Sequence, residues 1–180
     1  MERVAAVVLA AGEAERFGAP KQRLLLPAVL AKLHESPVDR IVVVQGAYPL
    51  EVPRGAPARG APTTLVTCAD WDRGPGASLR CGLAALEPDP EVVAAVVVLA
   101  DGPDLSPEAV ARVLEAWRLD GGIVAASYGG ERGHPLVIGR GDWGDVPDEG
   151  LRRGTPRLVP CDDLGSPGDV DVPGDLRPGV

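Results

Sequence analysis

Two continuous apolar runs of strand length constrain the fold of this chain more than any other feature. They cover Val4–Ala10 and Ala94–Ala100, and neither alternates with polar residues. A strand with one solvated face alternates, whereas a continuous run indicates a strand that is covered on both faces. Further runs of strand length occur at Ile41–Val44, Thr64–Thr67, Ile123–Ser127, Leu136–Ile138 and Leu158–Val159.

Helical segments are predicted between these runs. Apolar residues share one helical face in Pro27–Glu35, Ser78–Leu86 and Ser106–Leu119. The third has the clearest boundaries, because Ser106 can cap free N–H groups and Pro107 sits where a missing donor costs nothing, while Gly121 ends the pattern. Strands that alternate with helices predict one α/β domain over residues 1–180, with a mainly parallel seven-stranded sheet and helices on both faces.

Composition narrows the classes of function. Eighteen Lys and Arg against 26 Asp and Glu give a formal charge of −8, so no broad nucleic-acid or membrane-surface binding is expected. Cys68, Cys81 and Cys161 are odd in number and contain no C-x-x-C pair, so neither a disulfide framework nor a zinc site is indicated. No export signal follows Met1, and no apolar run approaches the roughly 18 residues of a membrane span. The expected location is cytoplasmic.

The segment that follows the first strand carries the strongest functional signal. It reads LAAGEAERFGAPK over residues 9–21, and ligands of open α/β sheets bind beyond the carboxyl ends of strands. Its small residues let backbone N–H groups approach an anion or a base, and Arg16 and Lys21 can neutralise phosphate. Small residues alone would equally fit a glycine-containing turn with two exposed cations. The segment matches neither the P-loop nor the dinucleotide-binding pattern.

The pattern LAAG-x-x-x-RFG-x-x-K resembles the signature loop of nucleotidyltransferases similar to molybdenum cofactor cytidylyltransferase and guanylyltransferase. The resemblance implies a Rossmann-like domain whose loop wraps the base and the triphosphate of an NTP. By position, Arg16 and Lys21 would contact the phosphates and act in catalysis. Contacts to base and ribose would fall on Leu9, Ala10, Ala11 and Gly12.

Acidic residues follow at two places. The first is LADGPDL over residues 99–105, and a carboxylate at that sheet edge suits Mg²⁺, which prefers one or two carboxylates with phosphate oxygens and water. An isolated Asp before a helix would indicate only a turn residue. The whole segment, however, resembles the family's L-A-D-x-P-x-L element, and this resemblance implies that Asp101 is the metal ligand. Asp104 is interpreted as a turn residue. The tail DVDVPGDL over 169–176 is similar to the family's D-I-D-T-P-x-D-L element, which implies Asp171 as a second ligand.

Two further segments extend the resemblance. GPGASLRCGL over 74–83 resembles the family's G-M-x-x-S-L-x-x-G-L segment, which lines the nucleotide pocket, so Ser78 and Arg80 are nucleotide-binding candidates. A role of Ser78 as a simple helix cap is equally open. YGGERGHPL over 128–136 looks like the family's G-x-x-G-H-P turn between strands, which makes His134 the candidate donor to an acceptor phosphate, with turn stabilisation as the alternative.

The implied function is transfer of a nucleoside monophosphate from an NTP to a phosphorylated acceptor, with the molybdenum-pterin cofactor as the expected acceptor. CTP is expected over GTP, because LAAG loops accompany the cytidylyl enzymes of the family and LAGG loops the guanylyl ones. A methyl group at Ala11 would crowd a purine more than a pyrimidine.

Two other functions stay open at this point. One is transfer to a sugar phosphate or another small phosphorylated alcohol. The other is a non-catalytic assembly protein that binds nucleotide and serves a molybdenum hydroxylase or its chaperone. It is suggested because the chain lacks the family's Gly-Lys-Pro segment after Pro27.

Overall fold

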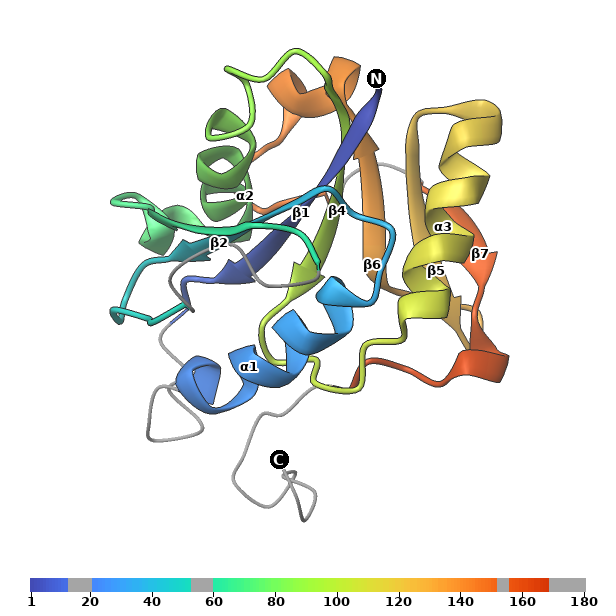
Figure 1. Cartoon of the computed structure of the whole chain (residues 1–180), viewed down its shortest axis with the longest axis horizontal. Helices are drawn as coiled ribbons and strands as arrows, with labels where there is room; N and C mark the ends of the chain where they lie inside the picture. Colours follow the sequence, from blue (N-terminus) through green and yellow to red (C-terminus); the bar gives the residue numbers. More distant parts are fainter. Residues whose placement is uncertain (13–20, 53–59, 152–155, 169–180) are drawn as a thin grey trace.

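One sheet of seven strands organises the described parts of this computed structural model, which are residues 1–12, 21–52, 60–151 and 156–168. The strand order is β3-β2-β1-β4-β6-β5-β7 (Figure 1). The strands are β1 (Arg3–Ala10), β2 (Arg40–Gln45), β3 (Thr63–Thr67), β4 (Val92–Leu99), β5 (Ile123–Tyr128), β6 (Glu131–Gly139) and β7 (Arg157–Pro160). Strands β1 to β4 pair in parallel, β5 and β7 are parallel, and β6 is antiparallel to both β4 and β5. The predicted mainly parallel sheet is confirmed.

The two continuous apolar runs form the adjacent central strands β1 and β4. Their side chains divide alternately between two cores, one on each face of the sheet. In β1, for example, Val8 belongs to one core and Val7 to the other, and both are fully buried. A continuous run is needed here because neither face of these strands meets solvent.

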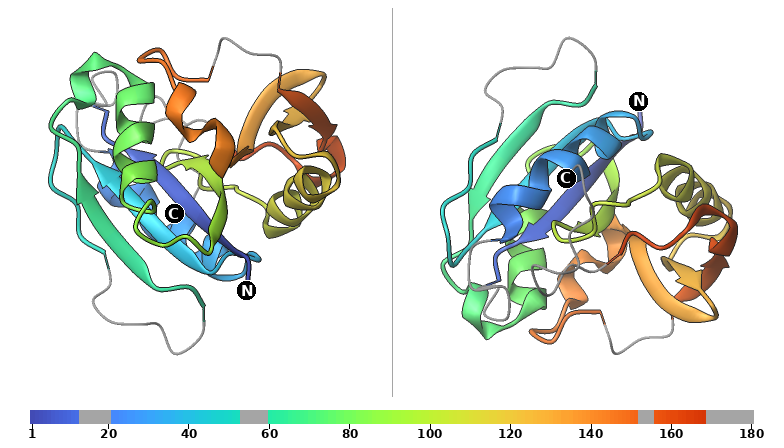
Figure 2. Two further views of the ribbon diagram at one scale, coloured as in Figure 1. Left: turned by 90° about the horizontal axis from the view of Figure 1, so that it is seen from above. Right: turned by 90° about the horizontal axis from the view of Figure 1, so that it is seen from below.

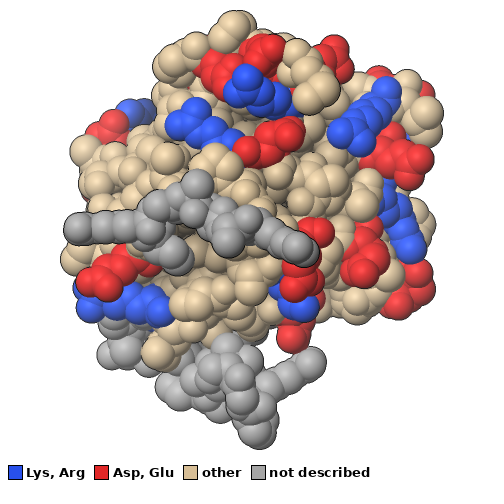
Figure 3. Space-filling view, viewed as in Figure 1, with Lys and Arg blue, Asp and Glu red and all other residues tan. Residues whose placement is uncertain are grey.

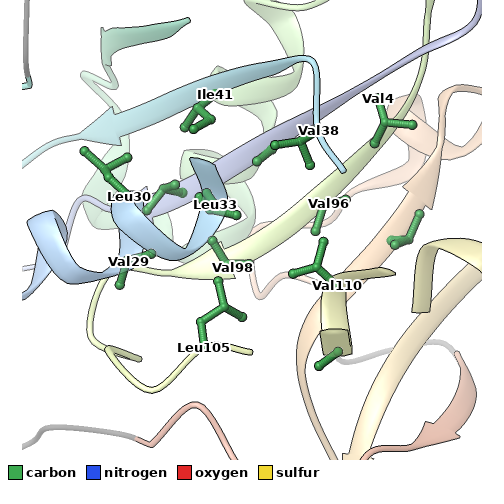
Figure 4. Packing of buried hydrophobic residues seen from close by; sticks show 14 of the residues in the cluster. Val4, Val29, Leu30, Leu33, Val38, Ile41, Val96, Val98, Leu105 and Val110 are labelled. Atoms are coloured by element: carbon green, nitrogen blue, oxygen red, sulfur yellow. The ribbon is translucent and has the colours of Figure 1, made fainter. Parts of the chain in front are cut away.

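Helices cover both faces of the sheet (Figure 2). On one face lie α1 (Lys21–His34) and α3 (Pro107–Asp120), and Figure 4 shows Leu33 of α1 and Val110 of α3 packed around Val96 and Val98 of β4. On the other face α2 (Pro75–Ala84) packs Leu79 against the second core. Short 3₁₀ helices complete the described fold: η2 (Trp71–Arg73), η3 (Arg140–Asp145) and η4 (Asp162–Leu164).

The predicted boundaries of α3 are confirmed to within one residue. The Ala109 amide donates to Ser106 Oγ at 3.2 Å, which is the expected N-cap. At the other end, the Gly121 amide donates to the Trp117 carbonyl at 2.7 Å.

Three other predicted boundaries were wrong. Helix α1 begins at Lys21 and not at Pro27. Pro27 lies inside the helix with its ring exposed. The helix tolerates it at the cost of one hydrogen bond, because proline has no amide N–H to donate to the Arg23 carbonyl. Helix α2 begins at Pro75 with Gly74 as its N-cap, because proline is preorganised for the first helical position. Strand β6 begins at Glu131, so the segment interpreted as a turn is mostly strand.

Two cysteines are joined, contrary to the expectation from the sequence. Cys68, after β3, and Cys81, on α2, form a disulfide with their Cα atoms 5.7 Å apart. The expectation of no disulfide was wrong because the packing of α2 beside β3 brings together residues that are 13 positions apart, and that packing leaves no mark in the cysteine spacing. Cys161 is free and buried.

Gly82 marks a close approach of α2 to the sheet. A Cβ atom at this position would lie 2.5 Å from Val7 Cγ1 and 3.0 Å from Val44 Cγ2. Overpacking of a core lowers the free energy of unfolding by about 1–3 kcal/mol, whereas replacement of a helical glycine by alanine raises it by about 0.5–1 kcal/mol. We therefore expect Gly82→Ala to lower the free energy of unfolding by about 1–2 kcal/mol in urea denaturation.

Gly141→Ala is the matched control for this variant. No heavy atom lies within 4 Å of a Cβ built at Gly141, so the free energy of unfolding should stay within about 0.5 kcal/mol of the wild type. Equal denaturation midpoints for the two variants would contradict the close packing at Gly82.

Charges of both signs mix on the described surface. On the face shown in Figure 3, blue and red side chains lie side by side, in keeping with ion pairs such as Arg3–Asp89 and Arg112–Asp163. Such pairs at exposed positions contribute little stability. Within the described residues, no helix combines the length and the apolar character that a membrane crossing requires.

Candidate active site

Two segments that carry sequence motifs meet at the carboxyl edge of the sheet. We call residues 9–12, at the end of β1, the small-residue loop, and residues 100–105, after β4, the acidic turn. The Ala100 amide, just after β4, donates to the Leu9 carbonyl near the end of β1 at 3.1 Å. The Ala47 amide, just after β2, donates to the Ala11 carbonyl at 3.0 Å. The parallel register of β1, β2 and β4 therefore places the small-residue loop beside the acidic turn.

Lys21 and Asp101 form an ion pair across this edge. Lys21 Nζ lies 3.0 Å from Asp101 Oδ2, and the two side chains are 7% and 23% exposed. Lys21 is the first residue of α1, and Asp101 follows β4 by two positions. A lysine this deeply buried requires a partner for its charge. The structure thus joins, through one contact, the cation and the carboxylate that the sequence assigns to phosphate and metal.

Gln22 is a site residue that the sequence analysis missed. Its side chain is 6% exposed, and Nε2 donates to the Gly12 carbonyl at 3.0 Å, which fixes the end of the small-residue loop. Its Oε1 is buried and has no hydrogen-bond partner among the described residues. Nothing in the sequence singled out Gln22, because the predicted helix began at Pro27 and left Gln22 outside any predicted helix or strand.

Ala11 does not face an open pocket. It is 5% exposed, and its methyl group lies 2.8 Å from a Cβ atom built on Gly46. The methyl group is therefore turned into the fold, and the argument that it crowds a purine directly was wrong. Any effect of Ala11 on the choice of base would act through the loop backbone. Leu9 is partly buried, Ala10 is 4% exposed and Gly12 is exposed.

The two candidates on α2 have different surroundings. Ser78 is buried, at 4% exposed, within the helix, so it is not the cap. Arg80 donates to the Val146 carbonyl at 2.7 Å and also to Asp148, which Arg73 contacts at 2.9 Å. Hydrogen bonds from Arg80 and Arg73 lower the pKa of Asp148. Arg80 therefore holds the segment after η3 against α2, and a nucleotide contact for it remains a prediction.

A cavity of about 240 Å³ opens beside the acidic turn. The predicted acceptor residue His134, which lies within β6, lines this cavity, and its carbonyl accepts a hydrogen bond from the Tyr128 hydroxyl at 3.0 Å. A contact of its imidazole with an acceptor remains a prediction. The other lining residues come from β4, the turn after it, β6 and the segment after η4: Val98, Leu99, Gly102, Leu105, Arg132, Gly133, Ser166, Pro167 and Gly168.

Arg132 is a second residue that the sequence analysis missed. It precedes His134 by two positions in β6, and alternation along a strand puts both on one face, toward the cavity. It also donates to the Leu151 carbonyl. Burial and, second, the charge of Arg132 lower the pKa of His134 to about 4, while Asp101 acts in the opposite sense. At neutral pH the imidazole is therefore an uncharged donor, and Arg132 supplies the positive charge of the cavity.

Gly102 shapes the floor of this cavity. A Cβ atom at Gly102 would lie 3.1 Å from Pro167 Cβ, and the Asp104 amide donates to the Pro167 carbonyl at 2.9 Å. The small residue therefore lets the segment after η4 approach the acidic turn.

Two predicted site residues, Arg16 and Asp171, lie outside the described residues. Among the residues that are described, no group of three or more His, Cys, Asp and Glu side chains is arranged to hold a metal. Asp101 alone still fits the requirement of Mg²⁺ for one or two carboxylates together with phosphate oxygens and water. In this structure the carboxylate is paired with the Lys21 ammonium.

The chain is similar to several solved structures over most of its length. The homologue of Mycobacterium tuberculosis Rv0371c from Mycobacterium sp. strain JC1 is 29% identical, with a TM-score of 0.75, over 97% of this chain and 94% of that one. Rv0371c from M. tuberculosis H37Rv is 25% identical, with a TM-score of 0.77, over 97% and 95%. A nucleotidyl transferase from Methanothermobacter thermautotroptrophicus shares the fold at 21% identity and a TM-score of 0.63, over 84% and 79%.

A structure of Rv0371c in complex with manganese is also similar, at 25% identity and a TM-score of 0.73, over 96% of this chain and 95% of that one. No curated protein matches the chain. The sequence model of the MobA-like NTP transferase domain matches residues 6–155, which include the second half of β1, the acidic turn and His134. The chain therefore belongs to the family of MobA-like NTP transferase domains.

Proposed function

We propose that the protein transfers a nucleoside monophosphate from CTP to the terminal phosphate of a molybdopterin-type acceptor and releases pyrophosphate. The observation that carries this proposal is the pair of Lys21 and Asp101, 3.0 Å apart at the edge where the small-residue loop ends. Membership of the NTP transferase family supports the reaction type. The resemblance of the LAAG loop and the Gly-His-Pro segment to molybdenum cofactor cytidylyltransferases supports the choice of substrates.

In this reaction an acceptor phosphate oxygen attacks the α-phosphorus, and the bond from that phosphorus to the oxygen bridging to the β-phosphorus breaks. The ionised acceptor needs no base, so catalysis rests on positioning and on stabilisation of negative charge. Lys21 and Arg16 are proposed to hold the triphosphate. A bound Mg²⁺, held by Asp101 and Asp171, would supply Lewis-acid stabilisation of the phosphate oxygens. The manganese complex of Rv0371c supports a divalent cation here.

The acceptor is proposed to bind in the cavity that contains His134 and Arg132. Neutral His134 can donate a hydrogen bond to an oxygen of the acceptor phosphate, and the positive charge of Arg132 can offset the negative charge of that phosphate. The cavity, at about 240 Å³, is smaller than the roughly 300–1,000 Å³ of typical ligand pockets. It therefore suits the phosphate-bearing end of an acceptor. A molybdenum hydroxylase or its chaperone is the proposed recipient of the product, with the cytoplasm as the proposed location.

The experiment that tests this function measures pyrophosphate release with Mg²⁺, each NTP in turn and a panel of acceptors. Release that requires the molybdopterin acceptor supports the proposal. Release with a sugar phosphate or a small phosphorylated alcohol would instead support a different nucleotidyltransferase. Nucleotide binding without release under any condition would support the non-catalytic assembly protein.

We predict that CTP is used in preference to GTP. This expectation rests on the resemblance of the LAAG loop to cytidylyltransferases. A pocket that separates similar substrates by packing alone discriminates by roughly ten- to two-hundred-fold, so the preference should be measurable without being absolute. Competition between the two nucleotides at equal concentration gives the ratio of their kcat/KM values. A wild-type protein that favours GTP would refute the cytidylyl assignment and leave the nucleotidyltransferase assignment standing.

A further inference from the structure

The Lys21–Asp101 pair puts two proposed ligand-binding groups in contact with each other. The ammonium, meant for a triphosphate, lies 3.0 Å from the carboxylate, meant for a metal. The Lys21 side chain is 7% exposed, so bulk water contributes little to the stabilisation of its charge. The ion pair thus offsets part of the charge of both groups.

We propose that Lys21 serves as the internal counter-ion of Asp101 and competes with the divalent cation for this carboxylate until a nucleotide binds. The triphosphate then takes the Lys21 ammonium as its own partner, and Asp101 is released to the metal. The inference rests on the proposed function, because it takes Asp101 as the metal ligand. It assigns to Lys21 a control over metal binding in addition to its contact with phosphate.

Electrostatics supports this competition. Mg²⁺ binds carboxylate oxygens at about 2.0–2.1 Å, closer than the ammonium now lies, so a metal on Oδ2 would face a positive charge at short range. Two like charges in a site of low water content repel strongly, because the effective dielectric constant there is well below that of water. A metal ion alone must therefore displace an established ion pair. A triphosphate that binds together with the metal supplies Lys21 with a new anionic partner, so the ion pair is exchanged for another contact between opposite charges.

The consequence is that metal and nucleotide bind as a unit. Coupling between two ligands is reciprocal, and its usual size corresponds to a change in affinity of roughly 5–150-fold. Removal of the Lys21 charge should abolish the competition. The variant is then expected to bind metal more tightly than the wild type when nucleotide is absent, although the same variant binds nucleotide more weakly. A lysine that only contacts phosphate would not change metal affinity in this direction.

The test measures Mn²⁺ binding to the full chain without nucleotide, by isothermal titration and by electron paramagnetic resonance. Lys21→Met removes the charge and keeps most of the apolar stem, Lys21→Arg keeps the charge, and Lys32→Met makes the same change on the same helix away from Asp101. Asp101→Asn removes the proposed ligand. We expect Mn²⁺ to bind Lys21→Met about tenfold more tightly than the wild type, within the usual range of coupling. Lys21→Arg and Lys32→Met should resemble the wild type, and Asp101→Asn should lose the binding.

The wild type provides a second measurement that does not depend on the folding of a variant. Mn²⁺ affinity is compared with and without the non-transferable analogue α,β-methylene-CTP, which should raise it about tenfold or more. Unchanged Mn²⁺ affinity in folded Lys21→Met, with binding still lost in Asp101→Asn, overturns the competition and leaves the metal site intact. Equal wild-type affinity with and without the analogue also overturns it. Mn²⁺ binding that survives in Asp101→Asn refutes the metal site of the proposed function instead.

Discussion

Asp101→Asn should reduce nucleotidyl transfer by at least about a hundredfold while the protein stays folded. Asparagine keeps the shape of the side chain, and its carbonyl oxygen can still accept a hydrogen bond from Lys21, so the packing at the edge of the sheet is preserved. The variant loses the negative charge that a divalent cation requires. Steady-state pyrophosphate release measures the loss, and circular dichroism with thermal unfolding verifies the fold.

Asp104→Asn is the matched control for this loss. It makes the same change three positions further along, in the turn that leads to α3, and Asp104 is interpreted as a turn residue. Its turnover should remain close to that of the wild type. Wild-type turnover in Asp101→Asn, or an equal loss in both variants, would remove Asp101 from the catalytic site.

Lys21→Ala should lower kcat/KM for the NTP by about 10²–10³, the usual cost of removing one group that stabilises developing negative charge. The variant should also bind the nucleotide more weakly in isothermal titration. Lys32→Ala, on the last turn of the same helix, tests whether the loss of any positive charge from α1 has this effect. Unchanged nucleotide affinity together with unchanged turnover in Lys21→Ala would show that the lysine serves only the ion pair with Asp101.

Several features of the fold and the site could be predicted because their causes are local in the sequence. The continuous apolar runs of β1 and β4 specify strands buried on both faces, and the cap at Ser106 specifies where α3 begins. The carboxyl ends of parallel strands meet at one edge, so the positions of Lys21 and Asp101 followed from the motifs and the topology together.

Other features depend on contacts between distant segments and left no local signal. The Cys68–Cys81 disulfide follows from the packing of α2 beside β3. Arg132 enters the cavity because it lies two residues before His134 on a strand that the sequence analysis had made too short. The neutral state of His134 follows from burial and from Arg132, and neither can be read from a Gly-His-Pro motif.

Packing also overrides local preference at the start of α1. A proline is favoured in the first turn of a helix, whereas Pro27 lies inside α1. The side chains of Lys21, Gln22 and Leu25 are buried in the first turns of α1, despite the proline inside the helix. Lys21 contacts Asp101, and Gln22 contacts a carbonyl of the small-residue loop at the sheet edge. This early start of the helix is what carries Lys21 to Asp101.

The central claim, that the chain catalyses nucleotidyl transfer, is tested most directly by following the label of CTP. The protein is incubated with Mg²⁺, the molybdopterin acceptor and CTP that carries ³²P at the α-position or at the γ-position. The account predicts that the α-label appears in the acceptor product and the γ-label in pyrophosphate, in equal amounts and only when the acceptor is present. An α-label that stays in CTP, or that is released as CMP whether or not the acceptor is present, would contradict it.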